Sequence, residues 1–222
     1  GDPSNDLGGY PSELGPTDHG FLPSNAGYFH GGDLAGLTSR LDYLAGLGIT
    51  SIWITPPFVN TPTLGDGTVG GSSAGYHGYW QVDFTRVDPH LGTDAEMIAF
   101  VDAAHERGIK VFFDAVTNHT SDVITYQSRT TPYRWKETYP YRDADGNPFD
   151  PAALPPGTAF PALDTEVSFP YVPVFRSEED ATVKAPAWLN DVTLYHNRGN
   201  FEERPEAITY GDFYGLDDLF TE

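Results

Sequence analysis

Cysteine is absent from this chain of 222 residues, which excludes disulfides and thiolate metal sites. No apolar run reaches the roughly 18 residues that a membrane-spanning helix needs, so no membrane is expected as a partner. Basic residues are scarce, because 12 Lys and Arg stand against 32 Asp and Glu and give a formal net charge of −20. Such a surface repels nucleic acids and anionic membranes, which argues against both as partners. The charge suits a secreted, extracellular protein, a neutral substrate or a saline habitat, and a high-GC genome would give the same composition.

Hydrophobic residues make up 39% of the chain, which is enough for one or two domains with a packed core. The first 33 residues are rich in Gly, Pro, Asn and Asp and predict an irregular loop. Five leucines between 34 and 47 recur at helical spacing, with Asp33 as a cap and Gly48 after the end. A second helix is expected from Thr93, because Thr93 and Glu96 form a capping box. Each helix precedes an apolar run typical of a buried parallel strand, at 49–55 and at 109–114.

The helix–strand–helix–strand order is the repeat of a (β/α) barrel or a doubly wound sheet, so the fold class is α/β. The segment 56–92 lies between strand and helix, and we expect it to be a long functional loop. Beyond residue 120 helical periodicity is missing, and short edge strands are expected around the prolines of 169–175. Two parallel strands cannot close a barrel, so we expect the chain to be a fragment of a larger polypeptide.

The carboxyl end of the second expected strand carries three polar residues, Asp114, Asn118 and His119. Ligands of parallel α/β folds bind just beyond such strand ends, which makes these residues candidates for a site. A buried strand that simply ends in a polar loop would look the same. This segment alone therefore leaves both interpretations open.

Three blocks in order resemble sequence signatures of the α-amylase family of glycoside hydrolases (family 13). They read GYHGYW at 75–80, DAVTNH at 114–119 and YGDFYGLDDL at 210–219. The resemblance implies a partial TIM (β/α)8 barrel over residues 1–119, which contains strands two and three with their helices. It implies an irregular inserted domain B over residues 120–222.

The resemblance implies α-glucan (starch and maltooligosaccharide) hydrolysis by a retaining glycosidase mechanism. In the family the catalytic acids follow strands four, five and seven of the barrel. None of them is expected in this chain, so we expect the fragment alone to be inactive and to need the remainder of its own polypeptide.

The resemblance also assigns roles in a sugar-binding cleft. Tyr79 would stack on the sugar whose bond is cut, while His77 and His119 would bind its hydroxyl groups. Trp80 would pack beside Tyr79. Asp114 would have a supporting role by holding an arginine beside the missing nucleophile. Taken alone, each histidine fits an ordinary loop or strand-end position equally well.

The resemblance implies Ca²⁺ as a cofactor, an ion that takes amide, carboxylate and carbonyl oxygens. By resemblance, Asn118 and Asp212 would hold one ion between barrel and insert, with Glu202 or Glu203 as a weaker candidate. The N-terminal loop resembles a second Ca²⁺ site of cyclodextrin-forming and neopullulanase-like members. Its ligands would be Asp2, Asn5, Asp6, Gly31 and Asp33. The same residues also fit ordinary turns and a helix cap.

Other functions stay open at this stage. A pullulanase, a cyclodextrinase or a glucan transferase of the same family would share these blocks. A noncatalytic carbohydrate-binding protein on the same scaffold would share them too. An unrelated α/β enzyme is disfavoured by the aromatic block, and no phosphate-binding glycine motif follows either expected strand.

Overall fold

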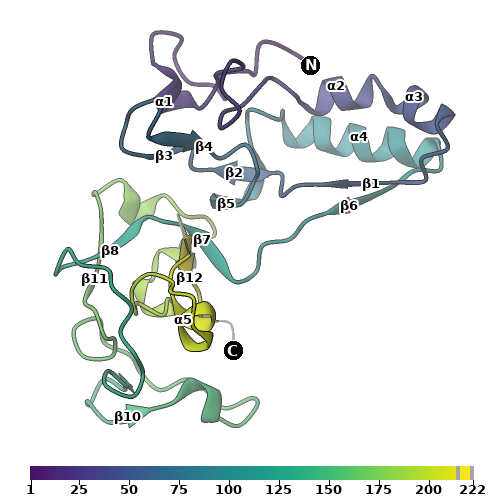
Figure 1. Cartoon of the computed structure of the whole chain (residues 1–222). Coiled ribbons are helices and arrows are strands. Elements are labelled where there is room, and N and C mark those ends of the chain that lie inside the picture. The colour runs from purple at the N-terminus through teal and green to yellow at the C-terminus, as the bar shows by residue number, and fades with distance from the viewer. Residues whose placement is uncertain (214–215, 221–222) are drawn as a thin grey trace. The chain divides into compact units, whose positions relative to one another are not determined.

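The computed structural model describes residues 1–213 and 216–220 (Figure 1). The chain divides into two compact units, Gly1–Val116 and Thr117–Glu222. The boundary expected from the sequence, between residues 119 and 120, lies three residues further along the chain. Part of the third sequence block, residues 214 and 215, lies outside the described residues.

The first unit is built on two parallel strands, β1 (Ser51–Ile54) and β6 (Lys110–Phe113), which pair from Ser51 with Lys110 onward. Their helices are α2 (Leu34–Thr38), α3 (Leu41–Gly46) and α4 (Asp94–Glu106). Figure 1 shows the three helices on one side of the two strands. The core between them consists of Leu34, Leu41, Val87, Met97, Phe100, Ala104 and Ile109. The predicted order of helices and strands and their parallel pairing are confirmed.

The single helix expected over residues 34–47 is wrong, because the chain breaks at Ser39 and Arg40 into α2 and α3. Asp33 caps α2 as predicted, since its side chain accepts a hydrogen bond from the Gly36 N–H at 2.6 Å. The Thr38 hydroxyl donates to the Leu34 carbonyl, and the Ser39 hydroxyl donates to the Gly36 carbonyl. Such hydroxyl bonds compete with the helical backbone and bend it.

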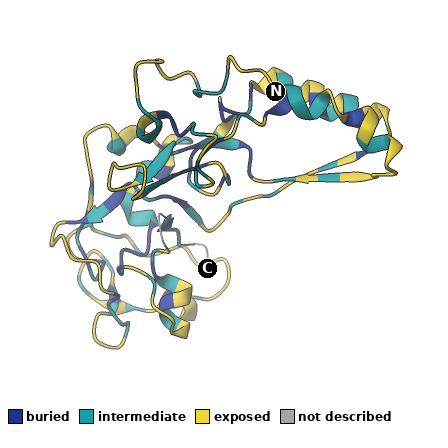
Figure 2. Cartoon of the chain, turned by 45° about the horizontal axis from the view of Figure 1, so that its top comes forward, coloured by how far each residue is buried: buried dark blue, intermediate teal, exposed yellow. Residues whose placement is uncertain are grey.

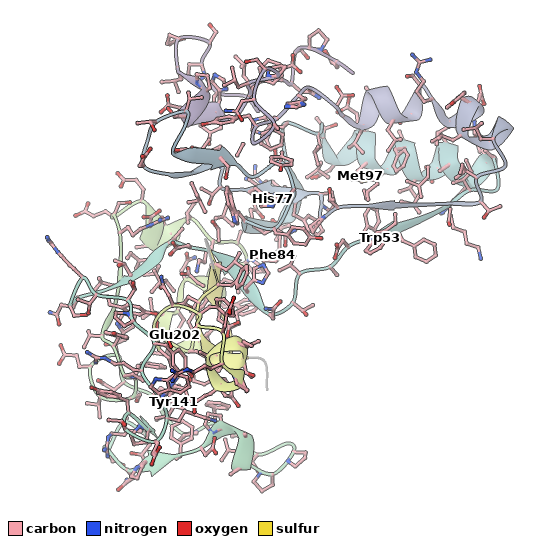
Figure 3. All side chains as sticks on the ribbon, in the orientation of Figure 1. Trp53, His77, Phe84, Met97, Tyr141 and Glu202 are labelled. Atoms are coloured by element: carbon pink, nitrogen blue, oxygen red, sulfur yellow. The ribbon has the colours of Figure 1, made fainter. Side chains whose placement is uncertain are left out.

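The two strands are less buried than predicted (Figure 2). Trp53 is 75% exposed and Phe112 is 54% exposed, whereas Ile52 and Ile54 pack against the helix core. Side chains of a strand alternate between two faces. Figure 3 shows Trp53 on the side away from the helices, a face that no other described element of this unit covers.

Helix α4 begins as the sequence predicts. The Thr93 hydroxyl accepts from the Glu96 N–H at 3.2 Å, and the Glu96 carboxylate accepts from the Thr93 N–H at 2.7 Å. This reciprocal pair satisfies two backbone donors that have no partner inside the helix. Met97 and Phe100 of this helix are buried.

The long loop expected at 56–92 contains four strands instead. They are β2 (Phe58–Asn60), β3 (Thr63–Gly65), β4 (Ser72–Ala74) and β5 (Gln81–Val87). Strand β2 pairs with β5 and β3 with β4, both antiparallel. Three of these strands have only three residues, which is too short to show alternation in the sequence. The first 33 residues are irregular as expected, apart from the short helix α1 (Pro16–His19).

The second unit holds its chain together with short ladders. Its strands are β7 (His119–Ser121), β8 (Ile124–Tyr126), β9 (Tyr141–Arg142), β10 (Pro148–Phe149), β11 (Pro173–Phe175) and β12 (Leu216–Asp218). They form the antiparallel pairs β7–β12, β8–β11 and β9–β10, beside one short α-helix, α5 (Pro205–Tyr210). The described part of this unit also contains 3₁₀ turns at 151–153, 180–182, 187–190 and 192–194. Strand β11 confirms the edge strand predicted within 169–175.

A buried ion pair lies inside the second unit. Lys184 is 2% exposed, and its Nζ lies 2.8 Å from an Asp217 carboxylate oxygen. The same carboxylate accepts from the backbone N–H groups of Val123 and Ile124. Buried charges persist only when they are paired and hydrogen-bonded, and both conditions hold here.

Among the helices of the described ranges, none has the length and apolar character that a membrane crossing requires.

Candidate functional site

The aromatic block leads into β5 and gathers its rings around His77. The His77 ring centroid lies 4.6 Å from that of Trp80, in an edge-on contact, and 5.7 Å from that of Tyr79, nearly parallel. Tyr76 contacts the same imidazole edge-on at 5.4 Å. The structure therefore brings together His77, Tyr79 and Trp80, the three candidate residues of the aromatic block. The imidazole lies between the two larger rings in this contact chain, although the sequence had led us to expect Trp80 to pack on Tyr79.

Hydrogen bonding fixes the tautomer of His77. Its Nδ1 accepts from the Tyr79 N–H at 3.0 Å. Burial lowers the pKa of His77, so the ring is neutral at pH 7. A neutral imidazole that accepts at Nδ1 carries its proton on Nε2. His77 therefore presents an N–H donor at Nε2.

Asp114 contacts the aromatic block directly. The Tyr79 hydroxyl donates to the Asp114 carboxylate at 2.6 Å, and this bond raises the pKa of Tyr79. Tyr79 itself is 38% exposed. The expected arginine partner of Asp114 is not found among the described residues, and that role stays a prediction.

Two glycines let the aromatic block lie against the segment before it. Gly78 has φ +85°, and a Cβ there would overlap the Pro56 carbonyl oxygen. A Cβ at Gly75 would lie 2.6 Å from the Thr61 carbonyl oxygen. The sequence did not point to Asn60, whose side chain accepts from the Trp80 N–H at 2.7 Å. A single Asn at the end of an apolar run carries no signal of this role.

His119 and Asn118 lie in the second unit, at the start of β7. Nδ1 of His119 lies 3.1 Å from the Asn118 side-chain oxygen, and the Asn118 carbonyl accepts from the Leu219 N–H at 2.8 Å. The expected joint site of His77, Tyr79 and His119 draws on both units and stays a prediction.

The first pair of candidate calcium ligands, Asn118 and Asp212, bonds two successive backbone N–H groups. The Asp212 carboxylate accepts from the Asp218 N–H at 3.1 Å, and the Asn118 carbonyl accepts from the N–H of the next residue, Leu219. The Tyr126 hydroxyl donates to the other Asp212 oxygen. Burial raises the pKa of Asp212 to about 6. Glu202 is exposed, as is its neighbour Glu203, and no contact joins either to this pair.

Four of the five N-terminal calcium-ligand candidates make contacts in two pairs, Asp2 with Asp33 and Asp6 with Gly31. Asp33 is 8% exposed and accepts from the Asp2 N–H, while a Cβ at Gly31 would lie 2.6 Å from an Asp6 carboxylate oxygen. Asn5 lies between Asp2 and Asp6 in sequence, and its side-chain oxygen is buried without a hydrogen-bond partner.

A buried oxygen without a donor is what a bound cation would satisfy, so this donor set fits Ca²⁺. Asp2 and Asn5 line a cavity of about 530 Å³. Across the described ranges, however, no three His, Cys, Asp or Glu side chains are grouped as metal ligands, so amide and carbonyl oxygens would have to complete a shell.

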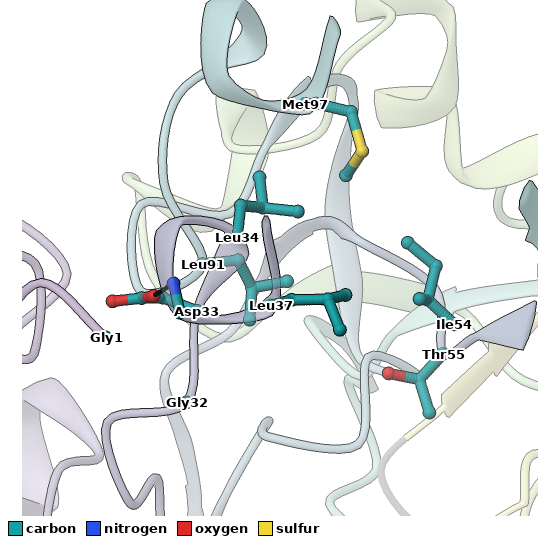
Figure 4. Close-up of a pocket in the computed structure, with 10 residues that line it drawn as sticks. Gly1, Gly32, Asp33, Leu34, Leu37, Ile54, Thr55, Leu91 and Met97 are labelled. Carbon is teal, nitrogen blue, oxygen red and sulfur yellow. Dashed lines mark hydrogen bonds between the residues drawn. The ribbon is translucent and has the colours of Figure 1, made fainter. Parts of the chain in front are cut away.

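A second cavity in this unit, of about 490 Å³, is apolar (Figure 4). It is lined mostly by Leu34, Leu37, Leu91, Ile54 and Met97, with Asp33 at one side. Apart from Asp33 it contains none of the candidate residues.

Comparison with known proteins places the chain in a family. The sequence model described as "Alpha amylase, catalytic domain" matches residues 8–154. An alpha-amylase of Streptomyces lividans is 49% identical over 204 residues, which are 91% of this chain and 22% of that protein. A periplasmic alpha-amylase of Escherichia coli (strain K12) is 44% identical over 138 residues, 57% of this chain and 19% of the relative. The chain thus spans about a fifth of the length of these relatives.

A solved structure supports the same placement. A cyclomaltodextrin glucanotransferase with a three-domain ABC distribution superposes with a TM-score of 0.57 at 30% identity. The match covers 99% of this chain and 36% of that protein. The family match includes the blocks at 75–80 and 114–119 on which the resemblance was based. The chain belongs to the alpha-amylase family of glycoside hydrolases, family 13.

Proposed function

We propose that the protein hydrolyses α-glucans such as starch and maltooligosaccharides by a retaining mechanism, and that this chain supplies part of the sugar-binding cleft. The observation that carries the proposal is the fixed group of His77, Tyr79 and Asp114. Its support in sequence comes from alpha-amylase relatives at 49% and 44% identity.

The group suits a neutral sugar. An aromatic face complements the C–H face of a pyranose, and the Tyr79 ring is held in place by its bond to Asp114. Nε2 of His77 donates a hydrogen bond to a sugar hydroxyl, and a carboxylate accepts one. A neutral ligand also avoids the repulsion that a chain of net charge −20 exerts on anions.

The acids that break the bond are proposed to lie outside these 222 residues. A retaining glycosidase needs two carboxyl groups about 5 Å apart across the glycosidic bond. Residues 1–222 alone should therefore bind sugar weakly and show no turnover. The remainder of the polypeptide is the partner that completes the site.

Substitution of Tyr79 tests this function in the full-length protein. Tyr79→Ala removes the ring and should lower kcat/KM for starch by about 10- to 100-fold, which corresponds to about 1.4–2.7 kcal/mol. Tyr79→Phe keeps the ring and removes the hydroxyl that bonds Asp114, so its loss of activity should be smaller. Reducing-sugar release from soluble starch gives the rates. Equal activity of Tyr79→Ala and the unaltered enzyme would refute a stacking role.

A glucan transferase is the second candidate, and the 0.57 TM-score with a cyclomaltodextrin glucanotransferase favours considering it. The two differ in product. A hydrolase releases reducing ends, whereas a transferase forms cyclic or rearranged glucans with little gain of reducing sugar. A noncatalytic binder would be retarded by starch in affinity electrophoresis and produce neither.

We also propose that the protein is secreted, and that Ca²⁺ is its cofactor with a structural role. One ion would use Asp212 and Asn118, which accept from the successive backbone N–H groups of Asp218 and Leu219. The other would use the N-terminal ligands Asp2, Asn5, Asp6, Gly31 and Asp33. When bound, Ca²⁺ would supply a charge that ties loop segments together. The acidic surface and the periplasmic relative support secretion.

Thermal unfolding with added metal tests the N-terminal site. Ca²⁺ at about 100 times its dissociation constant should stabilise the folded protein by about 2.7 kcal/mol. Asn5→Ala should reduce this gain, whereas Asn25→Ala, which removes a loop amide bonded only to its own turn, should not. Mg²⁺ at the same concentration is the ionic-strength control. An equal gain with Mg²⁺, or an undiminished gain in Asn5→Ala, would remove this site.

A further inference from the structure

The Asn60 side chain is 6% exposed at the end of β2 and bonds backbone groups on two segments. Its side-chain oxygen accepts from the Trp80 N–H at 2.7 Å, and its Nδ2 donates to the Phe58 carbonyl at 2.7 Å. Its own backbone N–H donates to the Asp88 carboxylate at 2.9 Å. Because both ends of the amide are used, its orientation is determined.

The pairing of β2 with β5 is irregular around this residue. Val59 pairs with Asp83 and Asn60 pairs with Gln81, so the register shifts between Val59 and Asn60. A bulge of this kind re-aims a side chain out of the regular ladder. Here the Thr61 N–H also donates to the Trp80 carbonyl at 2.8 Å. Both backbone groups of Trp80 are therefore bonded to residues 60 and 61.

The other end of the aromatic block rests on the same segment. The Gly75 N–H donates to the Pro62 carbonyl at 3.0 Å, and Gly78 lies against the Pro56 carbonyl without room for a side chain. The block 75–80 therefore lies along residues 56–62, and the Asn60 side chain bonds it.

The position of Trp80 is passed on to the candidate sugar-binding side chains. The Trp80 ring contacts the His77 ring at 4.6 Å, and His77 accepts from the Tyr79 N–H. Movement of the Trp80 backbone would shift the Nε2 donor of His77 and the ring of Tyr79 together. A displacement of about 1 Å in a positioning group can cost about 100-fold in rate.

We infer that Asn60 is a positioning residue of the sugar site, one that touches no substrate but holds Trp80 and, through it, His77 and Tyr79. The inference rests on the proposed glucan-acting function. Asn60→Ala in the full-length enzyme should lower kcat/KM for starch by about 10- to 100-fold. It should also speed hydrogen exchange of the peptide that covers residues 75–84 by tenfold or more, because Trp80 loses its acceptor.

Asn190 gives a matched control. Its side chain bonds the Lys184 N–H and the carbonyls of Lys184 and Ala187, so it clamps a turn of the second unit with the same kind of amide bonds. Asn190→Ala should lower the melting temperature without altering exchange in 75–84. The comparison separates a general loss of stability from loss of the sugar-site anchor.

Asn60→Asp provides a readout that a merely structural residue would not give. A protonated carboxyl has the donor and acceptor of the amide, whereas an ionised one would repel the Phe58 carbonyl and Asp88. Activity relative to the unaltered enzyme should therefore rise as pH falls. Asp88, its partner His90 and Tyr10 line the same cavity as Asn60, of about 260 Å³. Asp83 lies on the paired strand β5 opposite Val59, and all four groups are present in both proteins.

The outcomes separate the anchor from the function. Faster exchange in 75–84 together with lost kcat/KM in Asn60→Ala, and recovery of Asn60→Asp at low pH, support the inference. Unchanged exchange, unchanged kinetics or a flat activity ratio overturns it. If Asn60→Ala does not fold, the pH profile of Asn60→Asp decides. If the unaltered protein neither binds nor converts glucans, the proposed function fails. The exchange data then still test whether Asn60 holds Trp80 in place.

Discussion

The second unit contains a buried histidine, His196, whose pKa is shifted by its surroundings. His196 is 1% exposed, and its Nδ1 lies 2.8 Å from the Tyr141 hydroxyl. Burial, followed by the nearby positive charges of Arg198 and Lys136, lowers the pKa of His196 to about 3. Lys184 is buried as well, but Asp217 compensates its charge. His196 is therefore a neutral group that the folded chain resists protonating.

The protonation of His196 predicts acid destabilisation. Its pKa is about 3 in the folded chain and 6.5 when exposed, so the unfolded chain binds the extra proton as pH falls below 6.5. Stability from this group is complete above pH 6.5 and is lost progressively toward pH 3, with an upper bound of about 5 kcal/mol. His196→Gln should flatten the loss between pH 7 and pH 4, measured by equilibrium unfolding. His105→Gln, at an exposed position of α4, is the control. The same pH dependence in both variants would exclude His196 as its source.

Sequence alone identified part of the candidate site, and the reason lies in how side chains make contacts. The side chains of His77, Tyr79 and Asp114 can bind a ligand directly, so their residue types suggest a site. The structure joins these three residues by hydrogen bonds within the first unit. Asn60 acts only through backbone groups of Trp80 and Phe58. The bond between Asn60 and Trp80 depends on the bulge of β2, which no residue pattern predicts.

At the scale of elements, local signals predicted helix starts better than helix continuity. The capping pairs at Asp33 and Thr93 were correct because a cap depends on residues three positions apart. The break between α2 and α3 depends on whether the hydroxyls of Thr38 and Ser39 turn back on the helix, which leucine spacing does not reveal. The four strands within 56–92 depend on pairing between separate segments, and three of them have only three residues.

Two helical glycines give a prediction at this scale. Gly46 lies in α3, and a Cβ added there would meet no atom within 4 Å, so Gly46→Ala should stabilise the protein by about 0.5–1 kcal/mol. Gly36 lies in α2, where a Cβ would come within 3.0 Å of the Gly1 nitrogen and 3.1 Å of an Asp33 carboxylate oxygen. Gly36→Ala should gain nothing or lose stability. Denaturant midpoints of the two variants test the contrast. Equal gains in stability would mean that the atoms around Gly36 move aside at little cost.

For the whole molecule, the composition was the informative quantity. The 20 excess negative charges and the absence of cysteine limited the partners, and three sequence blocks identified the family before any contact was known. The ion pairs of the described residues are few beside the 32 acids, and several of them involve exposed groups such as Asp42. Many of the described acids are exposed, and the ion pairs of the described residues include only a few of them.

This charge excess predicts that salt stabilises the protein. Repulsion between exposed acids weakens as the screening length shortens from about 10 Å at 0.1 M salt to about 3 Å at 1 M. Raising NaCl over this range should therefore raise the melting temperature, and a gain of about 1 kcal/mol would appear as about 2–4 °C. Neutralising three exposed acids, in the combined variant Glu13→Gln, Asp102→Asn and Glu178→Gln, should reduce the salt effect. A neutral substitution at exposed Ser24, Ser24→Ala, should leave it unchanged. A melting temperature that stays constant or falls with NaCl would show that the acids do not destabilise the fold.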